Sequence, residues 1–220
     1  MKKILLACVL AGIVSCSNEN VSQDDQNVIE MQSKQKTVVE DQLDEFFSRY
    51  YTSEEFTNYY SSLKVFYTKL SYDWSPEELK TDEEVFNWFR LNLKKTKFGS
   101  VDEARTSYIN MNTLLVNLDT KFPEYDEIIL SNPIEVLSNK IGKWFPFENI
   151  PDSTLGKCES DYQGCRKTAS DNYATKAKVL ADIKNETGRV DLGERNRAMD
   201  DYNTEIDNCL STYRQCTGVE

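Results

Sequence analysis

The sequence predicts an all-α protein, in which a helical bundle is followed by a C-terminal antiparallel helical hairpin stapled by two disulfides. Apolar residues recur at steps of three and four along almost the whole chain after Thr37, which is the period of helices with one buried face. No stretch alternates between apolar and polar side chains clearly enough to predict a strand. Two octets near the C-terminus, CESDYQGC and CLSTYRQC, repeat the pattern Cys-x-x-x-Tyr-x-x-Cys.

Residues 1–15 have the layout of a secretory signal peptide. Lys2 and Lys3 precede an uninterrupted apolar run from Ile4 to Val14. This run is too short to span a bilayer, because a transmembrane helix takes roughly 20 apolar residues. We therefore expect the segment to direct export and to be removed.

The motif Ile13-Val14-Ser15-Cys16 follows directly. It resembles the lipobox of bacterial lipoproteins, in which an aliphatic residue, a tolerant position and a small residue precede the cysteine that is acylated. The resemblance covers only the N-terminus. It implies cleavage before Cys16 and lipid on Cys16, which would tether the protein to a membrane without spanning it. The alternative is an ordinary signal peptide with an incidental cysteine.

Position 17 bears on the destination of such a lipoprotein. Ser17 stands where inner-membrane lipoproteins of some Gram-negative bacteria carry Asp, so the resemblance favours the outer membrane and leaves the membrane face open. Residues 16–36 are polar and lack a sustained apolar period. They are expected to form a flexible tether between the anchor and the folded part.

Residues 37–143 are predicted to form an acidic helical bundle. Three pairs have the Ser/Thr-x-x-Glu spacing of a capping box, which marks a helix start: Thr52 with Glu55, Thr81 with Glu84, and Ser100 with Glu103. Phe98-Gly99 is expected to end the second of these helices and Pro123 to follow the third. A shorter helix is expected after Asn132-Pro133. The aromatic stripes suit a buried core, with a ligand groove as the alternative.

Residues 144–157, WFPFENIPDSTLGK, contain two prolines and several turn-forming residues. We expect them to link the bundle to the C-terminal hairpin, residues 158–220. Within the linker, Asp152-Ser153-Thr154 resembles the short O-glycosylation sequon of some bacterial envelope proteins, which implies a glycan on Ser153. The alternative is a solvated turn.

The C-terminal region has two helical stripes separated by ETGRVDLG, residues 186–193, which breaks the pattern with two glycines. A bond within one octet would join cysteines seven residues apart. On a helix this is about 10.5 Å, beyond the ~7 Å limit for a disulfide. A short turn makes the helices antiparallel, which pairs Cys158 with Cys216 and Cys165 with Cys209. Tyr162 and Tyr213 would then lie in the layer between the two bonds.

The four thiols could instead bind zinc or form a redox centre. Structural zinc sites usually use cysteines two to four residues apart, and the chain contains no histidine to complete a mixed site. A redox centre would be expected to show Cys-x-x-Cys or a feature that lowers a thiol pKa. Because an envelope location is oxidising, disulfides are favoured. No metal or cofactor is expected.

The charge is strongly acidic and uneven. Without Lys2 and Lys3 the chain keeps 24 basic and 37 acidic residues, and residues 16–156 hold 14 of the basic and 25 of the acidic ones. Nucleic acid is therefore not an expected partner, since phosphate binding needs a basic surface. The acidity indicates either simple solubility or a surface that docks a basic partner.

Common catalytic patterns are missing from the sequence, including every pattern that needs histidine. Glu54-Glu55 and Glu83-Glu84 could act as glycosidase carboxylates, but first-turn acids also stabilise helices. We therefore expect no enzymatic activity. The leading hypothesis is a membrane-tethered lipoprotein that binds another envelope component as scaffold, adaptor or accessory. The second is an inhibitor or immunity protein that neutralises a basic enzyme or toxin through its acidic helical surface.

Overall fold

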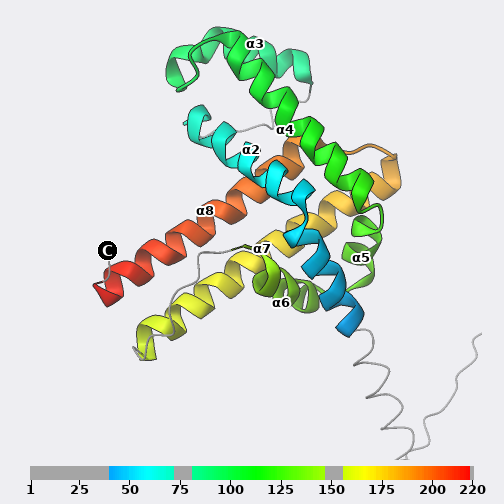
Figure 1. The fold of residues 1–220 in the computed structure, drawn as a ribbon, viewed down its shortest axis with the longest axis vertical. Helices are drawn as coiled ribbons and strands as arrows, with labels where there is room; N and C mark the ends of the chain where they lie inside the picture. The colour runs from blue at the N-terminus through cyan, green and yellow to red at the C-terminus, as the bar shows by residue number, and fades with distance from the viewer. Residues whose placement is uncertain (1–39, 72–80, 147–155, 219–220) are drawn as a thin grey trace, which may run out of the picture. The chain divides into compact units, whose positions relative to one another are not determined.

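All regular elements in the described part of the chain are helices (Figure 1). The computed structural model describes residues 40–71, 81–146 and 156–218. After a first helix, seen over residues 40–52, come α2 (Glu54–Leu70), α3 (Asp82–Asn92), the 3₁₀ turn η2 (Leu93–Lys95), α4 (Val101–Lys121), α5 (Tyr125–Ser131), α6 (Ile134–Trp144), α7 (Gly156–Thr187) and α8 (Leu192–Thr217). The all-α prediction with its C-terminal stapled hairpin is confirmed.

Two of the three predicted helix starts lie at the expected residue. At α3, Thr81 accepts a hydrogen bond from the Glu84 amide and the Glu84 carboxylate accepts one from the Thr81 amide, which completes a capping box. At α4, Ser100 accepts from the amide of Glu103. The Glu103 carboxylate instead accepts from the amide of Gly99, one residue earlier than in a capping box.

The predicted start at Thr52 is wrong by one residue. Ser53 is the N-cap of α2, and its side chain accepts from the Phe56 amide at 3.1 Å. Thr52 still belongs to the first helix and donates its hydroxyl to the carbonyl of Ser48. The first helix therefore runs one residue further than the spacing suggested, and Ser53 alone separates it from α2.

One further helix boundary differs from the sequence prediction, and one helix was not predicted. The helix after Thr81 ends with α3 at Asn92 and the turn at Lys95, before the expected stop at Phe98-Gly99. Helix α5 was not predicted, because Tyr125 to Ser131 spans only two turns and offers too few residues for a clear period. The predicted end of α4 before Pro123 and the helix after Pro133 are confirmed.

Helix α7 packs against three other helices. It contacts α5 and α6 as well as α8, so it buries more than the single seam of a two-stranded coiled coil. Ala169, Tyr173 and Ala177 lie on the predicted stripe and are buried. Ser170, Ala174 and Ala181 are also buried, and the contact of Ser170 with Gly142 of α6 shows that small residues allow close helix approach there.

Helices α2 and α4 pack against each other as an antiparallel pair. Lys69 bonds to Glu103 at one end and Lys121 lies 3.5 Å from Glu55 at the other. The core between the helices is mainly aromatic, as the stripes predicted. Phe56 is fully buried and its ring packs against those of Tyr50, Tyr51 and Phe145.

One hydrophobic cluster contains residues from both sides of the expected linker. Phe145 packs its ring against Tyr51 of the first helix and Tyr202 of α8, at 5.4 and 4.9 Å between ring centroids. Tyr173 of α7 stacks on Tyr202, and all four residues belong to the same cluster as the core of α2 and α4. The bundle and the hairpin are therefore two segments of sequence that share one core.

Candidate functional site

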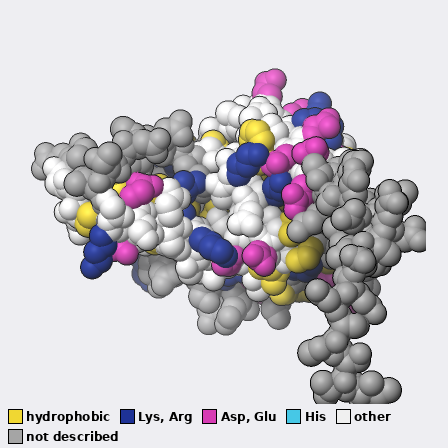
Figure 2. All heavy atoms as spheres, turned by 90° about the horizontal axis from the view of Figure 1, so that it is seen from below, with side chains coloured by type: hydrophobic (Ala, Val, Ile, Leu, Met, Phe, Trp, Pro, Cys, Tyr) yellow, Lys and Arg dark blue, Asp and Glu magenta, His cyan; other side chains and the backbone are white. Residues whose placement is uncertain are grey.

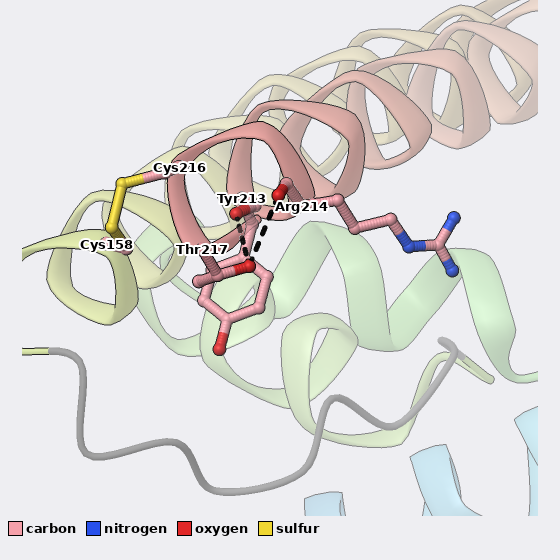
Figure 3. Close-up of a disulfide and its surroundings, with 5 residues drawn as sticks. All are labelled: Cys158, Tyr213, Arg214, Cys216 and Thr217. Carbon is pink, nitrogen blue, oxygen red and sulfur yellow. Dashed lines mark hydrogen bonds between the residues drawn. A yellow bond between two sulfur atoms is a disulfide. The ribbon is translucent and has the colours of Figure 1, made fainter. Parts of the chain in front are cut away.

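The two predicted disulfides are present. Cys158 is bonded to Cys216 and Cys165 to Cys209, with Cα–Cα distances of 5.9 and 5.8 Å. The rings of Tyr162 and Tyr213 pack between the two bonds, with centroids 5.1 Å apart. Figure 3 shows the outer bond joining the first turn of α7 to the last turn of α8, with Tyr213 next to it. The connectivity predicted from helix geometry is confirmed.

These bonds hold a part of the hairpin that does not belong to the main core. We call residues 158–165 and 209–216 the distal arm. Its buried residues, Tyr162, Cys209 and Tyr213, form a separate small cluster joined only by the half-buried Cys158 and Leu210. Figure 1 shows the cysteine-bearing ends of α7 and α8 extending away from α2–α5. With so little apolar surface to bury, the arm depends on its covalent bonds for order.

The base of the distal arm is fixed to the body by Arg166. Its guanidinium donates to the carbonyl of Gly142 in α6 at 2.8 Å and lies over the ring of Tyr162. At the C-terminal end of α8, Gly218 adopts a left-handed conformation with φ 69°. Its backbone N–H donates to the carbonyl oxygen of Arg214 and so caps the helix. The arm is thus a short rigid element with a defined beginning and end.

The surface of the distal arm is polar and mixes uncharged side chains with the exposed charged residues Asp161 and Arg214. Its exposed residues include Ser160, Gln163, Gly164, Ser211, Thr212 and Gln215. Uncharged side chains of this kind give up less hydration free energy on burial than charged ones, and they can both donate and accept hydrogen bonds. The exposed polar side chains of the arm can therefore both donate and accept hydrogen bonds.

The body of the hairpin is held by buried polar contacts instead. Asn196 of α8 is completely buried, accepts from the Tyr59 hydroxyl at 3.0 Å and donates to Asn112 at 2.7 Å, which joins α8 to α2 and α4. Next to it, Arg195 forms a largely buried ion pair with Asp119 of α4. No sequence pattern pointed to these roles, because Asn and Arg in a helix are usually exposed.

Helix α8 also carries an acidic stretch. Between Ala198 and Tyr213 it has Asp200, Asp201, Glu205 and Asp207 and no basic residue. Lys176 pairs with Asp201, and Asn172 donates to Glu205. Burial, followed by the repulsion of Asp201 and Asp207, raises the pKa of Asp200 to about 7.

Elsewhere the charges are interspersed. Figure 2 shows a face on which acidic and basic side chains lie next to one another. Asp44 illustrates such pairing: partial desolvation raises its pKa, but hydrogen bonds from Lys140, Trp144 and Lys143 outweigh this and lower it to about 2. The acidity counted in residues 16–156 is thus partly neutralised by local pairs.

The glutamate pairs considered for catalysis both lie in first turns. Glu55 pairs with Lys121 and Glu84 completes the capping box of α3. Glu54 and Glu83 are exposed. Their positions agree with the helix-stabilising interpretation of these acids.

The remaining predictions from the sequence concern residues outside the described ranges. Cys16 and Ser153 are both among these, as are the signal peptide and the tether. In the described ranges, no group of His, Cys, Asp or Glu side chains is arranged to hold a metal ion. Over the same ranges, none of the helices combines the length and the hydropathy needed to cross a bilayer.

No protein-family model, no curated protein and no solved structure matches the chain.

Proposed function

We propose that the protein is a lipid-anchored envelope protein that uses the distal arm to hold another envelope component, as a scaffold, adaptor or accessory subunit. The main support for this proposal is the distal arm itself. Two disulfides hold it together although its residues contribute almost nothing to the main hydrophobic core. A rigid element of this kind loses little conformational entropy when a partner binds, which favours affinity.

The attachment at Cys16 is the second part of the proposal and rests on the lipobox resemblance of residues 13–16. Cleavage and acylation there would leave the folded part on a polar tether, residues 16–36. Metabolic labelling with a fatty-acid analogue should mark the wild-type protein and leave Cys16→Ala unlabelled and released from the membrane fraction. A Cys16→Ala protein that stayed in the membrane and took up the label would contradict the anchor.

The role of the distal arm can be tested in intact cells by site-specific photo-cross-linking. A photoreactive amino acid at Gln163 or Thr212, both exposed on the arm, should give a cross-linked adduct with a distinct partner. The matched control is Asn117, which is exposed on α4. Adducts formed from Asn117 with equal yield, or no adduct from either arm position, would reject the arm as the binding element.

A second candidate function is inhibition of a basic enzyme or toxin, and the acidic stretch of α8 favours it. Such a complex should form quickly at low ionic strength and weaken steeply as salt is added, because exposed charge pairs are screened. Expression of the protein should protect cells from the enzyme. Substitution of Asp207 and Glu205 by Asn and Gln should slow association, whereas arm substitutions should not.

A further inference from the structure

A hollow of about 650 Å³ lies where the turn between α7 and α8 meets the start of α3 and the middle of α4. Its volume falls within the range of small-molecule sites, ~300–1,000 Å³. It is at the opposite end of the hairpin from the distal arm and shares no residue with it. The function proposed above does not use it.

One wall of this hollow is acidic and polar. Asp82 comes from the first turn of α3 and accepts from the Tyr108 hydroxyl of α4 at 3.4 Å. Asp191 is the N-cap of α8, and one of its carboxylate oxygens accepts from the Glu194 amide. Tyr108 is 93% buried, at 7% relative exposure. Carboxylates that flank a hydroxyl can surround an ammonium group with acceptors.

The same hollow also has a basic side chain in its lining. Arg189 lines it from the turn and is exposed. Among the described residues its guanidinium forms no ion pair, so its donors are available. A guanidinium matches a carboxylate with two parallel hydrogen bonds.

The rest of the lining includes aliphatic side chains. Ile183 of α7 is 42% exposed, and Val190 of the turn also lines the hollow. These residues can cover the apolar part of a ligand whose charged ends reach the acidic wall and Arg189.

We propose that this hollow binds a zwitterionic ligand, a short peptide with free amino and carboxyl ends and an aliphatic side chain. The ammonium lies against Asp82 and Asp191, the carboxylate pairs with Arg189, and the side chain packs on Ile183. Because about 650 Å³ lies in the middle of the range of small-molecule sites, a dipeptide or tripeptide fits the hollow better than a single amino acid.

The test is calorimetric titration of the full-length protein, extracted from membranes in detergent, with the dipeptide Leu-Leu. The same titration is repeated with N-acetyl-Leu-Leu, which lacks the ammonium, and with Leu-Leu-amide, which lacks the carboxylate. Each blocked peptide should bind at least about tenfold more weakly than Leu-Leu, since one charge-assisted contact is lost.

Variants then assign each end of the peptide to its residue. Asp191→Asn keeps a good N-cap and should weaken Leu-Leu about tenfold without weakening N-acetyl-Leu-Leu further. Arg189→Gln should weaken Leu-Leu but leave Leu-Leu-amide unchanged. Asp102→Asn and Arg90→Gln, at exposed positions that do not line the hollow, are the matched controls and should bind Leu-Leu as the wild type does.

Three results would overturn the proposal. The first is no binding of Leu-Leu at millimolar concentration by a protein with a normal thermal transition. The second is equal binding of the free and blocked peptides. The third is an equal loss of affinity in the control variants, which would show that removing any charge of that sign has the same effect.

Discussion

The distal arm and the rest of the α7–α8 hairpin are held together by different physical means. In the distal arm, two disulfides and a pair of tyrosines hold the helices together. In the rest of the hairpin, small residues such as Ala174 allow close packing, and buried polar groups such as Asn196 bond across to α2 and α4. The same pair of helices thus passes from a covalently restrained region to a region restrained by tertiary packing.

This difference shows what each kind of restraint is suited to. A disulfide needs only two residues at the correct distance, so it can order a segment that has no core. Buried asparagine and tyrosine hydrogen bonds need several helices around them. In this protein the segment with the smallest apolar cluster is the one that carries the two disulfides.

The largest effect is expected from Phe56→Ala in the body. Phe56 is fully buried and contacts several aromatic rings, so a cavity there should cost about 3–5 kcal/mol of unfolding free energy. Denaturant unfolding measures the loss, and peptide mapping should show both disulfides still formed. A loss below about 1 kcal/mol would mean that this aromatic core is not the main source of stability.

Removal of the outer disulfide, by Cys158→Ala together with Cys216→Ala, should come next. Loss of a bridge typically costs about 2–4 kcal/mol through the unfolded chain. Hydrogen exchange distinguishes this variant from Phe56→Ala, because amides in residues 158–165 and 209–216 should lose protection selectively. If protection were lost evenly over α7 and α8, the arm would not be a separate unit.

A smaller effect is expected from Asn196→Ala. The substitution leaves the Tyr59 hydroxyl and the side-chain oxygen of Asn112 without their buried partner, which should cost about 1–3 kcal/mol. Thermal unfolding measures this, with exposed Asn110→Ala as the control. Equal behaviour of the two variants would show that the buried hydrogen bonds do not stabilise the hairpin body.

The smallest effect concerns pH and Asp200. Since its folded pKa is raised to about 7 from 3.8, the folded state binds the proton more tightly than the unfolded state. Stability contributed by this group is full below about pH 4 and falls as pH rises towards 7. Asp200→Asn should therefore raise the melting temperature by a few degrees at pH 8 and leave it unchanged at pH 3.5. Asp102→Asn serves as the control. A similar rise in its melting temperature at pH 8 would show that the effect comes from lowering the net negative charge and not from Asp200 itself.

Much of the fold follows from local pattern. The capping box at Thr81 and the boundary before Pro123 are confirmed, because capping and proline effects act within a few residues. The start of α2 was misplaced because Thr52 and Ser53 are both suitable caps, and only the path of the chain selects Ser53. Helix α5 was missed because it is too short for periodicity to appear.

The sequence by itself determined the helical class and the pairing of Cys158 with Cys216 and Cys165 with Cys209, because helix rise and a short turn leave one compatible geometry. Only the tertiary structure decided that α7 packs against α5 and α6, that Asn196 is buried, and that Arg189 and Asp82 line one hollow. These features depend on residues far apart in the chain meeting in space, and no local spacing encodes such contacts.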